Sequence, residues 1–179
     1  MATKEQFLLD APQIEDIVKK AVFDKLNINV GNSEYSSWRN SLGNAMFHVI
    51  NDQAIPSDAG IAIEYRLNGR RFRIDFMIAG SDAAGLARVI IIELKQWTEV
   101  QESPTANHVL TYMGGGLREE PHPSYQAWSY QSHLELYNEF IYTSQVKVDS
   151  CAYLHNCVES AVIKGSAYEE LLLKSQVFI

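Results

Sequence analysis

The sequence lacks the features that would place it in a membrane or among secreted, disulfide-bonded proteins. It has only two cysteines in 179 residues, and a chain of this length buries about 70% of its unfolded surface without a disulfide or a structural metal. No apolar run approaches the roughly 20 residues that a membrane span needs, and the first ten residues lack the apolar core of a secretory signal. We therefore predict a cytoplasmic protein with free thiols and no membrane association.

Other absences argue against a P-loop ATPase, a zinc-binding module and a protein that coats nucleic acid. There is no Gly-x-x-x-x-Gly-Lys-Ser/Thr motif, so this chain should not bind ATP through a P-loop. Cys151, His155 and Cys157 lie close in sequence, but no fourth zinc ligand is evident, and buried strand thiols explain the cysteines better. The net charge of −7 argues against coating of nucleic acid through bulk positive charge, although a local basic patch could still bind phosphate.

Apolar periodicity predicts an α/β fold. The turn pair Asn68-Gly69 separates two alternating segments and indicates a hairpin, and 88–96 is apolar on both faces, as in a central strand. The region 103–122 is expected to be irregular, with Ser124 capping the next helix. We predict helices over 11–26, 34–50, 124–143 and 166–174 and strands over 61–67, 71–78, 88–96 and 146–154. This order (αβββαβ) gives a central mixed four-stranded sheet flanked by helices.

Three charged residues in the predicted strands point to metal chemistry. Glu93 and Lys95 are two apart on one strand and therefore share a face, where ionised groups are costly unless paired or coordinated. Asp75 lies on the adjoining hairpin strand and could reach Glu93. Two carboxylates beside an ammonium group can hold a divalent cation and place a water for phosphodiester hydrolysis. The alternative is a structural salt-bridge cluster.

These residues carry a resemblance to a known family. Arg73-Ile74-Asp75-Phe76 followed by Ile92-Glu93-Leu94-Lys95 resembles the two-part signature of the PD-(D/E)XK nuclease superfamily, and Gln126-Ala127-Trp128-Ser129-Tyr130 is similar to the Gln-x-x-x-Tyr motif of its RecB-like branch. The resemblance implies a restriction-endonuclease-like core and a Mg²⁺ or Mn²⁺ ion. It also implies roles for five residues: Asp75 and Glu93 as metal ligands, Lys95 as the group that assists the attacking water, and Gln126 and Tyr130 as residues that border the site.

The superfamily often adds an acidic residue from a helix before the hairpin. Glu34, at the start of the second predicted helix, is the best match, as a further catalytic residue and metal ligand. A negative charge there equally suits the N-terminal end of a helix dipole. Glu64, on the first hairpin strand, is a weaker alternative.

A closer resemblance covers about 34–156. Stretches including Trp38–Leu42, Glu93–Trp97, Tyr112–Gly116 and His122–Trp128 are similar to a group of bacterial proteins in which a nuclease-like domain precedes a Schlafen-type superfamily-one helicase domain. It implies a single nuclease-like domain over 1–179. Its parts are an N-terminal helical extension (1–33), the core (34–156) and a C-terminal helix or linker (157–179) that leads to a downstream helicase domain.

The expected substrate is nucleic acid, DNA rather than RNA. Four arginines cluster around the predicted hairpin and are candidate phosphate contacts, although charge on an exposed hairpin also protects a sheet edge; they are Arg66, Arg70, Arg71 and Arg73. The function expected is a Mg²⁺- or Mn²⁺-dependent deoxyribonuclease. Two rivals are a non-catalytic nucleic-acid-binding module with a nuclease fold and an interaction domain that docks through its aromatic-rich third helix.

Overall fold

The computed structural model describes residues 1–67, 72–158 and 161–179. The predicted turn at Asn68-Gly69 and two candidate arginines, Arg70 and Arg71, lie outside these ranges. The chain forms two compact units, 1–63 and 64–179, so the predicted core of 34–156 includes parts of both. The α/β class with a mixed sheet flanked by helices is confirmed. Among the described residues, no helix has the length and apolarity to cross a bilayer.

Unit 1 is mainly helical. Its elements are β1 (Ala2–Thr3), α1 (Lys4–Asp10), η1 (Ala11–Gln13), α2 (Ile14–Leu26), α3 (Asn32–Trp38), the π-helix η2 (Arg39–Met46) and α4 (Phe47–Ile50). β2 (Gly60–Arg66) leads from unit 1 into unit 2, and its start pairs antiparallel with β1. Helical structure begins at Lys4, earlier than predicted, and Thr3 caps it: Thr3 Oγ1 accepts a hydrogen bond from Gln6 N at 3.2 Å.

Unit 2 contains the strands of the predicted site. β3 (Arg73–Ser81) pairs antiparallel with β4 (Ala87–Lys95), which pairs parallel with β8 (Lys147–Leu154), so β4 is central, as its apolar run predicted. β9 (Gln176–Phe178) adds a further parallel strand beside β8. The prediction of four strands was therefore too few. In the segment 157–179, which was predicted to be a C-terminal helix or linker, Val177 is buried and pairs with β8.

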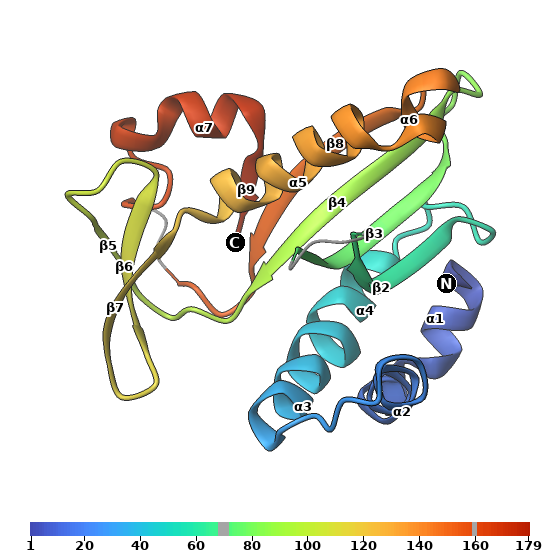
Figure 1. The fold of residues 1–179 in the computed structure, drawn as a ribbon, viewed down its shortest axis with the longest axis horizontal. Helices are drawn as coiled ribbons and strands as arrows, with labels where there is room; N and C mark the ends of the chain where they lie inside the picture. Colours follow the sequence, from blue (N-terminus) through green and yellow to red (C-terminus); the bar gives the residue numbers. More distant parts are fainter. Residues whose placement is uncertain (68–71, 159–160) are drawn as a thin grey trace. The chain divides into compact units, whose positions relative to one another are not determined.

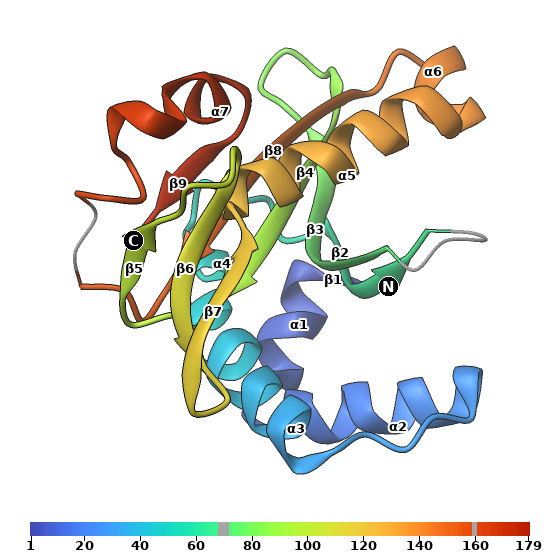
Figure 2. The same ribbon diagram turned by 60° about the vertical axis from the view of Figure 1, so that its left-hand side comes forward.

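The prediction of an irregular segment over 103–122 was wrong. β5 (Val100–Glu102), β6 (His108–Met113) and β7 (Gly116–Pro121) form a separate three-stranded antiparallel sheet, seen at the left of Figure 2. β6 and β7 are joined by Gly114 and Gly115, which have φ values of 59° and 84°. Two consecutive positive φ angles are what a tight two-residue hairpin turn requires, so the glycines that suggested a loop are the turn itself.

Helix α5 (Pro123–Tyr137) lies along β4 and β8, as Figure 1 shows. Its buried residues Tyr130 and Leu134 pack against Val89 and Ile91 of β4. The predicted continuation to Thr143 is interrupted at Asn138, which is extended, and whose side chain caps α6 (Glu139–Thr143). The last helical segment, predicted over 166–174, is confirmed as η3 (Ser166–Tyr168) and α7 (Glu169–Lys174).

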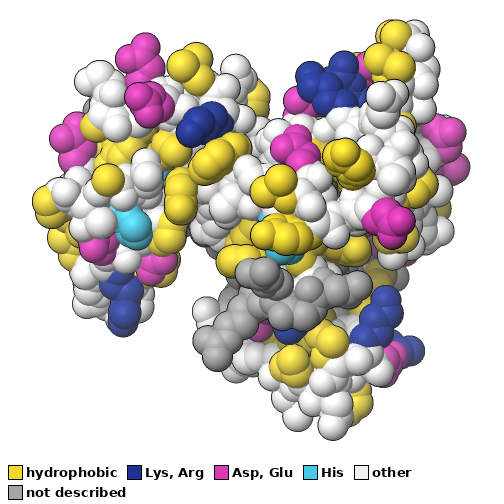
Figure 3. All heavy atoms as spheres, turned by 45° about the horizontal axis from the view of Figure 1, so that its top comes forward, with side chains coloured by type: hydrophobic (Ala, Val, Ile, Leu, Met, Phe, Trp, Pro, Cys, Tyr) yellow, Lys and Arg dark blue, Asp and Glu magenta, His cyan; other side chains and the backbone are white. Residues whose placement is uncertain are grey.

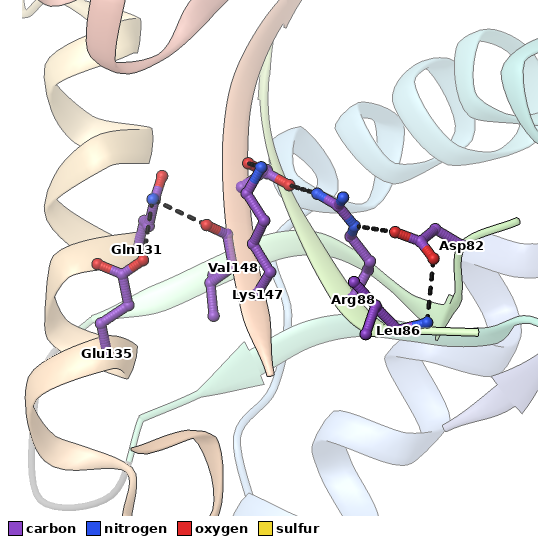
Figure 4. Close-up of polar contacts among 8 residues, drawn as sticks. Asp82, Leu86, Arg88, Gln131, Glu135, Lys147 and Val148 are labelled. Carbon is purple, nitrogen blue, oxygen red and sulfur yellow. Dashed lines mark hydrogen bonds and ion pairs between the residues drawn. The ribbon is translucent and has the colours of Figure 1, made fainter. Parts of the chain in front are cut away.

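Polar contacts hold α5 and the strands in register (Figure 4). Gln131 Nε2 donates to Val148 O of β8 at 2.9 Å, and Ser150 Oγ donates to Gln131 Oε1 at 2.8 Å. At the far end of the sheet, Arg88 of β4 contacts Asp82 at 2.8 Å and Asp149 of β8 at 3.1 Å. These contacts join the β3–β4 turn, β4, β8 and α5, so the elements that carry the candidate residues are fixed relative to one another.

The first turn of α5 is capped by His122 and not, as predicted, by Ser124. His122 is fully buried. Its Nδ1 accepts from Ser124 N at 3.1 Å, and its Nε2 lies 3.0 Å from Ile163 O. Because the Ile163 carbonyl can only accept and Ser124 N–H can only donate, His122 must be the neutral tautomer protonated at Nε2. Its ring also stacks on Tyr168, with ring centroids 4.4 Å apart.

Acid should weaken this anchor. Burial lowers the pKa of His122 below its ordinary 6.5, so the unfolded chain takes up the proton first, and stability is lost as the pH falls from about 6.5 through the folded-state pKa. We expect the His122 contribution to the free energy of unfolding, measured by urea titration as the difference between the wild type and His122→Gln, to decrease between pH 7 and pH 5. His122→Gln should be less stable at pH 7 and should lose this component of the pH dependence. His48→Gln, at an exposed site, should keep it, and an unchanged profile for His122→Gln would contradict the assignment.

Candidate active site

Five predicted residues converge in unit 2 from three elements. Lys95 Nζ on β4 donates to Glu93 Oε1 at 2.8 Å and to Gln126 Oε1 of α5 at 3.0 Å. Gln126 Nε2 in turn donates to the Tyr130 hydroxyl at 2.9 Å. Asp75 of β3 joins from the other side, because its Oδ2 accepts from Leu94 N of β4 at 3.0 Å. A continuous polar chain therefore runs from the strand acids to the helix.

The alternation of β4 explains why this chain forms at one end of the strand. Val89, Ile91, Glu93 and Lys95 project from the same face, and α5 covers that face. The first two pack into the apolar cluster beneath Leu134. Nearer the N-terminal end of α5, the residue that faces β4 is the polar Gln126. Its amide oxygen accepts the hydrogen bond from Lys95. The change from apolar to polar occurs at matching positions on the strand and on the helix.

Burial perturbs Glu93 strongly. It is 2% exposed, and burial raises its pKa to about 8, with Lys95 opposing the shift and Asp75 adding to it. Its Oε2 has no hydrogen-bond partner among the residues that the structure describes. Burial also raises the pKa of Asp75, and the bond from Leu94 N–H opposes that rise. The site thus holds two acids whose ionised forms are poorly compensated by the protein, so protonation is favoured over charge.

A divalent cation would supply the missing compensation. Over residues 1–67, 72–158 and 161–179, no group of three or more His, Cys, Asp and Glu side chains is arranged to hold a metal ion. Two carboxylates are nevertheless compatible with Mg²⁺, which proteins commonly bind through one or two carboxylates while water and substrate phosphate complete the octahedron. The Glu93 Oε2 atom, which has no hydrogen-bond partner among the described residues, can serve as a ligand once Glu93 is ionised. Asp75 and Glu93 therefore fit a hard divalent ion completed by water and substrate.

The two further candidate acids occupy different places. Glu34 lies in α3 of unit 1, and its role as a metal ligand stays a prediction. Glu64 belongs to unit 2; its Oε2 is 2.8 Å from Arg73 Nε, and its side chain is 10% exposed. Its φ of 53° is unusual for a non-glycine residue and directs the carboxylate out of the regular strand alternation. Glu64 is therefore an orienting partner of Arg73.

The described candidate arginines also differ. Arg73 lies on β3 with its side chain 38% exposed, and its positive charge lowers the pKa values of both Asp75 and Glu93. Arg66 is exposed at the end of β2. Arg73 is therefore the candidate phosphate contact that lies beside the acid pair.

Sequence reasoning missed the residues that support the site. His122 anchors the start of α5, and Gln131 fixes its middle to β8. A histidine just before a proline at the start of a helix was a usable signal for the first; nothing in the sequence marked the second. Trp97 is 7% exposed, and the Lys95 Nζ atom lies 5.2 Å from its ring centroid. Trp97 is therefore a packed side chain that adds a cation–π contact to Lys95. Cys151 and Cys157 are free thiols.

Comparison with known proteins adds no relative. No family model matches the chain, and neither the curated proteins nor the solved structures contain a significant match. The functional interpretation therefore depends on the sequence motifs and on the geometry of unit 2.

Proposed function

We propose that this protein hydrolyses phosphodiester bonds in DNA with the help of Mg²⁺ or Mn²⁺. One observation carries the proposal: a buried carboxylate pair, Asp75 and Glu93, lies beside the ammonium group of Lys95, which Gln126 holds in place. Phosphodiester hydrolysis with a metal ion needs acidic ligands for the cation and a positive charge near the reacting phosphate, and these residues can provide both. A protein core gains little stability from burying an acid whose second oxygen is unpartnered.

The arrangement of strands supports the finer assignment to a PD-(D/E)XK nuclease with a restriction-endonuclease-like core. Asp75 lies on β3, the Glu-x-Lys pair on the antiparallel neighbour β4, and the Gln-x-x-x-Tyr pair on α5, which leads to the parallel strand β8. We also propose that the chain works as the N-terminal part of a larger protein with a helicase domain. This rests on the motif resemblance alone.

In the proposed reaction each side chain has one task. A bound divalent cation supplies Lewis-acid stabilisation of the charge that develops on the phosphate. Asp75 and Glu93 provide its carboxylate ligands. Lys95 donates hydrogen bonds that place the attacking water and offset negative charge on the phosphate. Gln126 keeps the ammonium group oriented, and Tyr130 fixes the amide of Gln126. Arg73, at the exposed side, binds the substrate backbone.

A non-catalytic nucleic-acid-binding module is the second candidate. The observation that favours it is the direct contact of 2.8 Å between Lys95 and Glu93, which a purely structural ion pair would also make. If this candidate is correct, the chain should bind nucleic acid equally well with and without a chelator and should not cleave it. The two functions therefore give opposite results in one assay.

Replacement of Lys95 by alanine tests the proposal. End-labelled single- and double-stranded DNA are incubated with the purified chain and Mg²⁺, Mn²⁺ or a chelator. We expect metal-dependent cleavage, slowed about 100-fold in Lys95→Ala, the typical effect of removing one preorganised donor from a transition state. Lys147→Ala removes a lysine on β8 that is 59% exposed and should cleave at the wild-type rate. Cleavage that survives the chelator, or is equal in Lys95→Ala, would rule out the mechanism.

A further inference from the structure

A row of aromatic rings extends away from the candidate site. Tyr130, whose hydroxyl belongs to the polar chain of the site, has its ring centroid 5.9 Å from that of Phe72. Phe72 is 5.9 Å from His133, and His133 is 4.7 Å from Tyr137. We call these four residues the aromatic row. Three of them project from α5 at spacings of three and four residues, which places them on one side of the helix.

The row is buried at the end that belongs to the site and exposed at its outer end, with His133 half-buried between Phe72 and Tyr137. Tyr130 is 7% exposed, Phe72 41% and Tyr137 69%. Beside its outer end is a shallow hollow lined by Tyr65, Leu67, His133, Leu134, Tyr137 and Asn138. Exposed rings next to a hollow leave faces against which a flat, apolar ligand can stack. The inner end is part of the site, so a ligand that lies on the row is directed towards Asp75 and Glu93.

The distribution of charge indicates that a ligand on the aromatic row would be bound by ring stacking and not by bulk positive charge. The chain carries a net charge of −7. On the face drawn in Figure 3, the described Lys and Arg side chains lie in separate small groups, whereas hydrophobic side chains gather near the centre of the view. Glu135 accepts a hydrogen bond from Gln131 Nε2 at 3.1 Å, and Gln131 also contacts Val148 of β8, so this carboxylate lies on the side of α5 that meets β8 and not on the side that carries the row. Arg73, whose side chain is 38% exposed beside the acid pair and ion-paired with Glu64, is the cation of β3 at the inner end.

We propose that the aromatic row binds the bases of single-stranded nucleic acid and leads the strand into the candidate site. Every base offers a flat face to an aromatic ring, and this contact tolerates any sequence. In a duplex the same faces are occupied by neighbouring base pairs and are hidden from the row. The part of this inference that concerns delivery to Asp75 and Glu93 rests on the proposed nuclease function; binding by the row does not.

Binding of a fluorescent oligothymidylate, measured by anisotropy in the presence of a chelator, tests the row without cleavage. We expect the wild-type chain to bind it more tightly than the corresponding duplex. Tyr137→Ala and His133→Ala should each weaken binding of the single strand roughly five- to a hundredfold, the usual effect of removing one stacking ring. Tyr137→Phe keeps the ring and should bind like the wild type. Tyr142→Ala, which removes a tyrosine that is 80% exposed and outside the row, should also bind normally.

The outcomes separate the two proposals. The row assignment is overturned if the wild type does not bind the oligothymidylate, if Tyr137→Ala and His133→Ala bind it as tightly as Tyr142→Ala does, or if duplex binds equally well and weakens equally. Far-ultraviolet circular dichroism and melting curves show that the variants compared are folded. If the row binds the strand but no DNA is cleaved, the nuclease proposal fails and the row stands. If DNA is cleaved but the row variants bind the oligothymidylate normally, the nuclease proposal stands and the row assignment fails.

Discussion

Glu93→Gln is expected to lower the rate of metal-dependent DNA cleavage by a factor of about 1000 or more. The substitution keeps the size and shape of the side chain but removes the charge that would bind the cation. Loss of Lewis-acid stabilisation worth about 4 kcal/mol corresponds to that factor in rate. Lys95 exchanges an ionised partner at 2.8 Å for a neutral amide oxygen and keeps Gln126 at 3.0 Å, so its ammonium group should stay near its present position.

Single-turnover cleavage of end-labelled DNA at saturating Mn²⁺ measures the effect. Glu169→Gln is the matched control, because Glu169 is exposed at the start of α7 and the same change there should leave the rate unaltered. The melting temperature of each variant shows whether it is folded. A Glu93→Gln protein that cleaves at a tenth of the wild-type rate or faster would exclude Glu93 as a metal ligand and with it the mechanism.

Much of the candidate site followed from geometry that the sequence makes visible. Residues two apart on a strand share a face, so Glu93 and Lys95 had to project together once 88–96 was identified as a strand. Residues four apart on a helix are neighbours, which placed Gln126 beside Tyr130. The apolar stretch around Ile91 could be recognised as a central strand, because a strand covered on both faces has no alternation. The structure brings these predicted pairs together through Lys95 and Gln126.

The predictions that failed concern features set by distant parts of the chain. β6 and β7 carry polar residues such as Glu119 and Glu120 and pair mainly with each other, so neither segment has a strong hydrophobic period. The cap of α5 depends on a carbonyl at Ile163, 41 residues away from His122. β9 is stabilised by parallel pairing with β8. This long-range contact cannot be predicted from the three residues of the strand. Local propensity cannot reveal any of these, because the partner determines the structure.

Glu93 also links stability to pH in a direction opposite to that expected for a surface acid. Its pKa is raised to about 8 in the folded chain, whereas an unfolded glutamate ionises near its ordinary 4.5. Between these values the folded state holds the extra proton. Stability is therefore greatest below about pH 4.5 as far as this group is concerned and falls as the pH rises to about 8. In the presence of a chelator, the wild type should lose on the order of 4 kcal/mol across this window.

The same proton must leave when a cation binds, because a metal ligand has to be deprotonated. We expect the apparent affinity for Mn²⁺ to rise by about tenfold per pH unit between pH 6 and pH 8 and to level off above that, since one proton is released for each ion bound below the pKa of Glu93. Titration calorimetry in buffers of different ionisation enthalpy measures both the affinity and the proton release.

In Glu93→Gln, Mn²⁺ binding should be weak and its pH slope absent, and the chelator-treated protein should lack the loss of stability between pH 4.5 and pH 8. Equal Mn²⁺ affinities at pH 6 and pH 8 in the wild type would show that the cation does not displace the Glu93 proton. The buried acid would then be a structural partner of Lys95 and not a metal ligand.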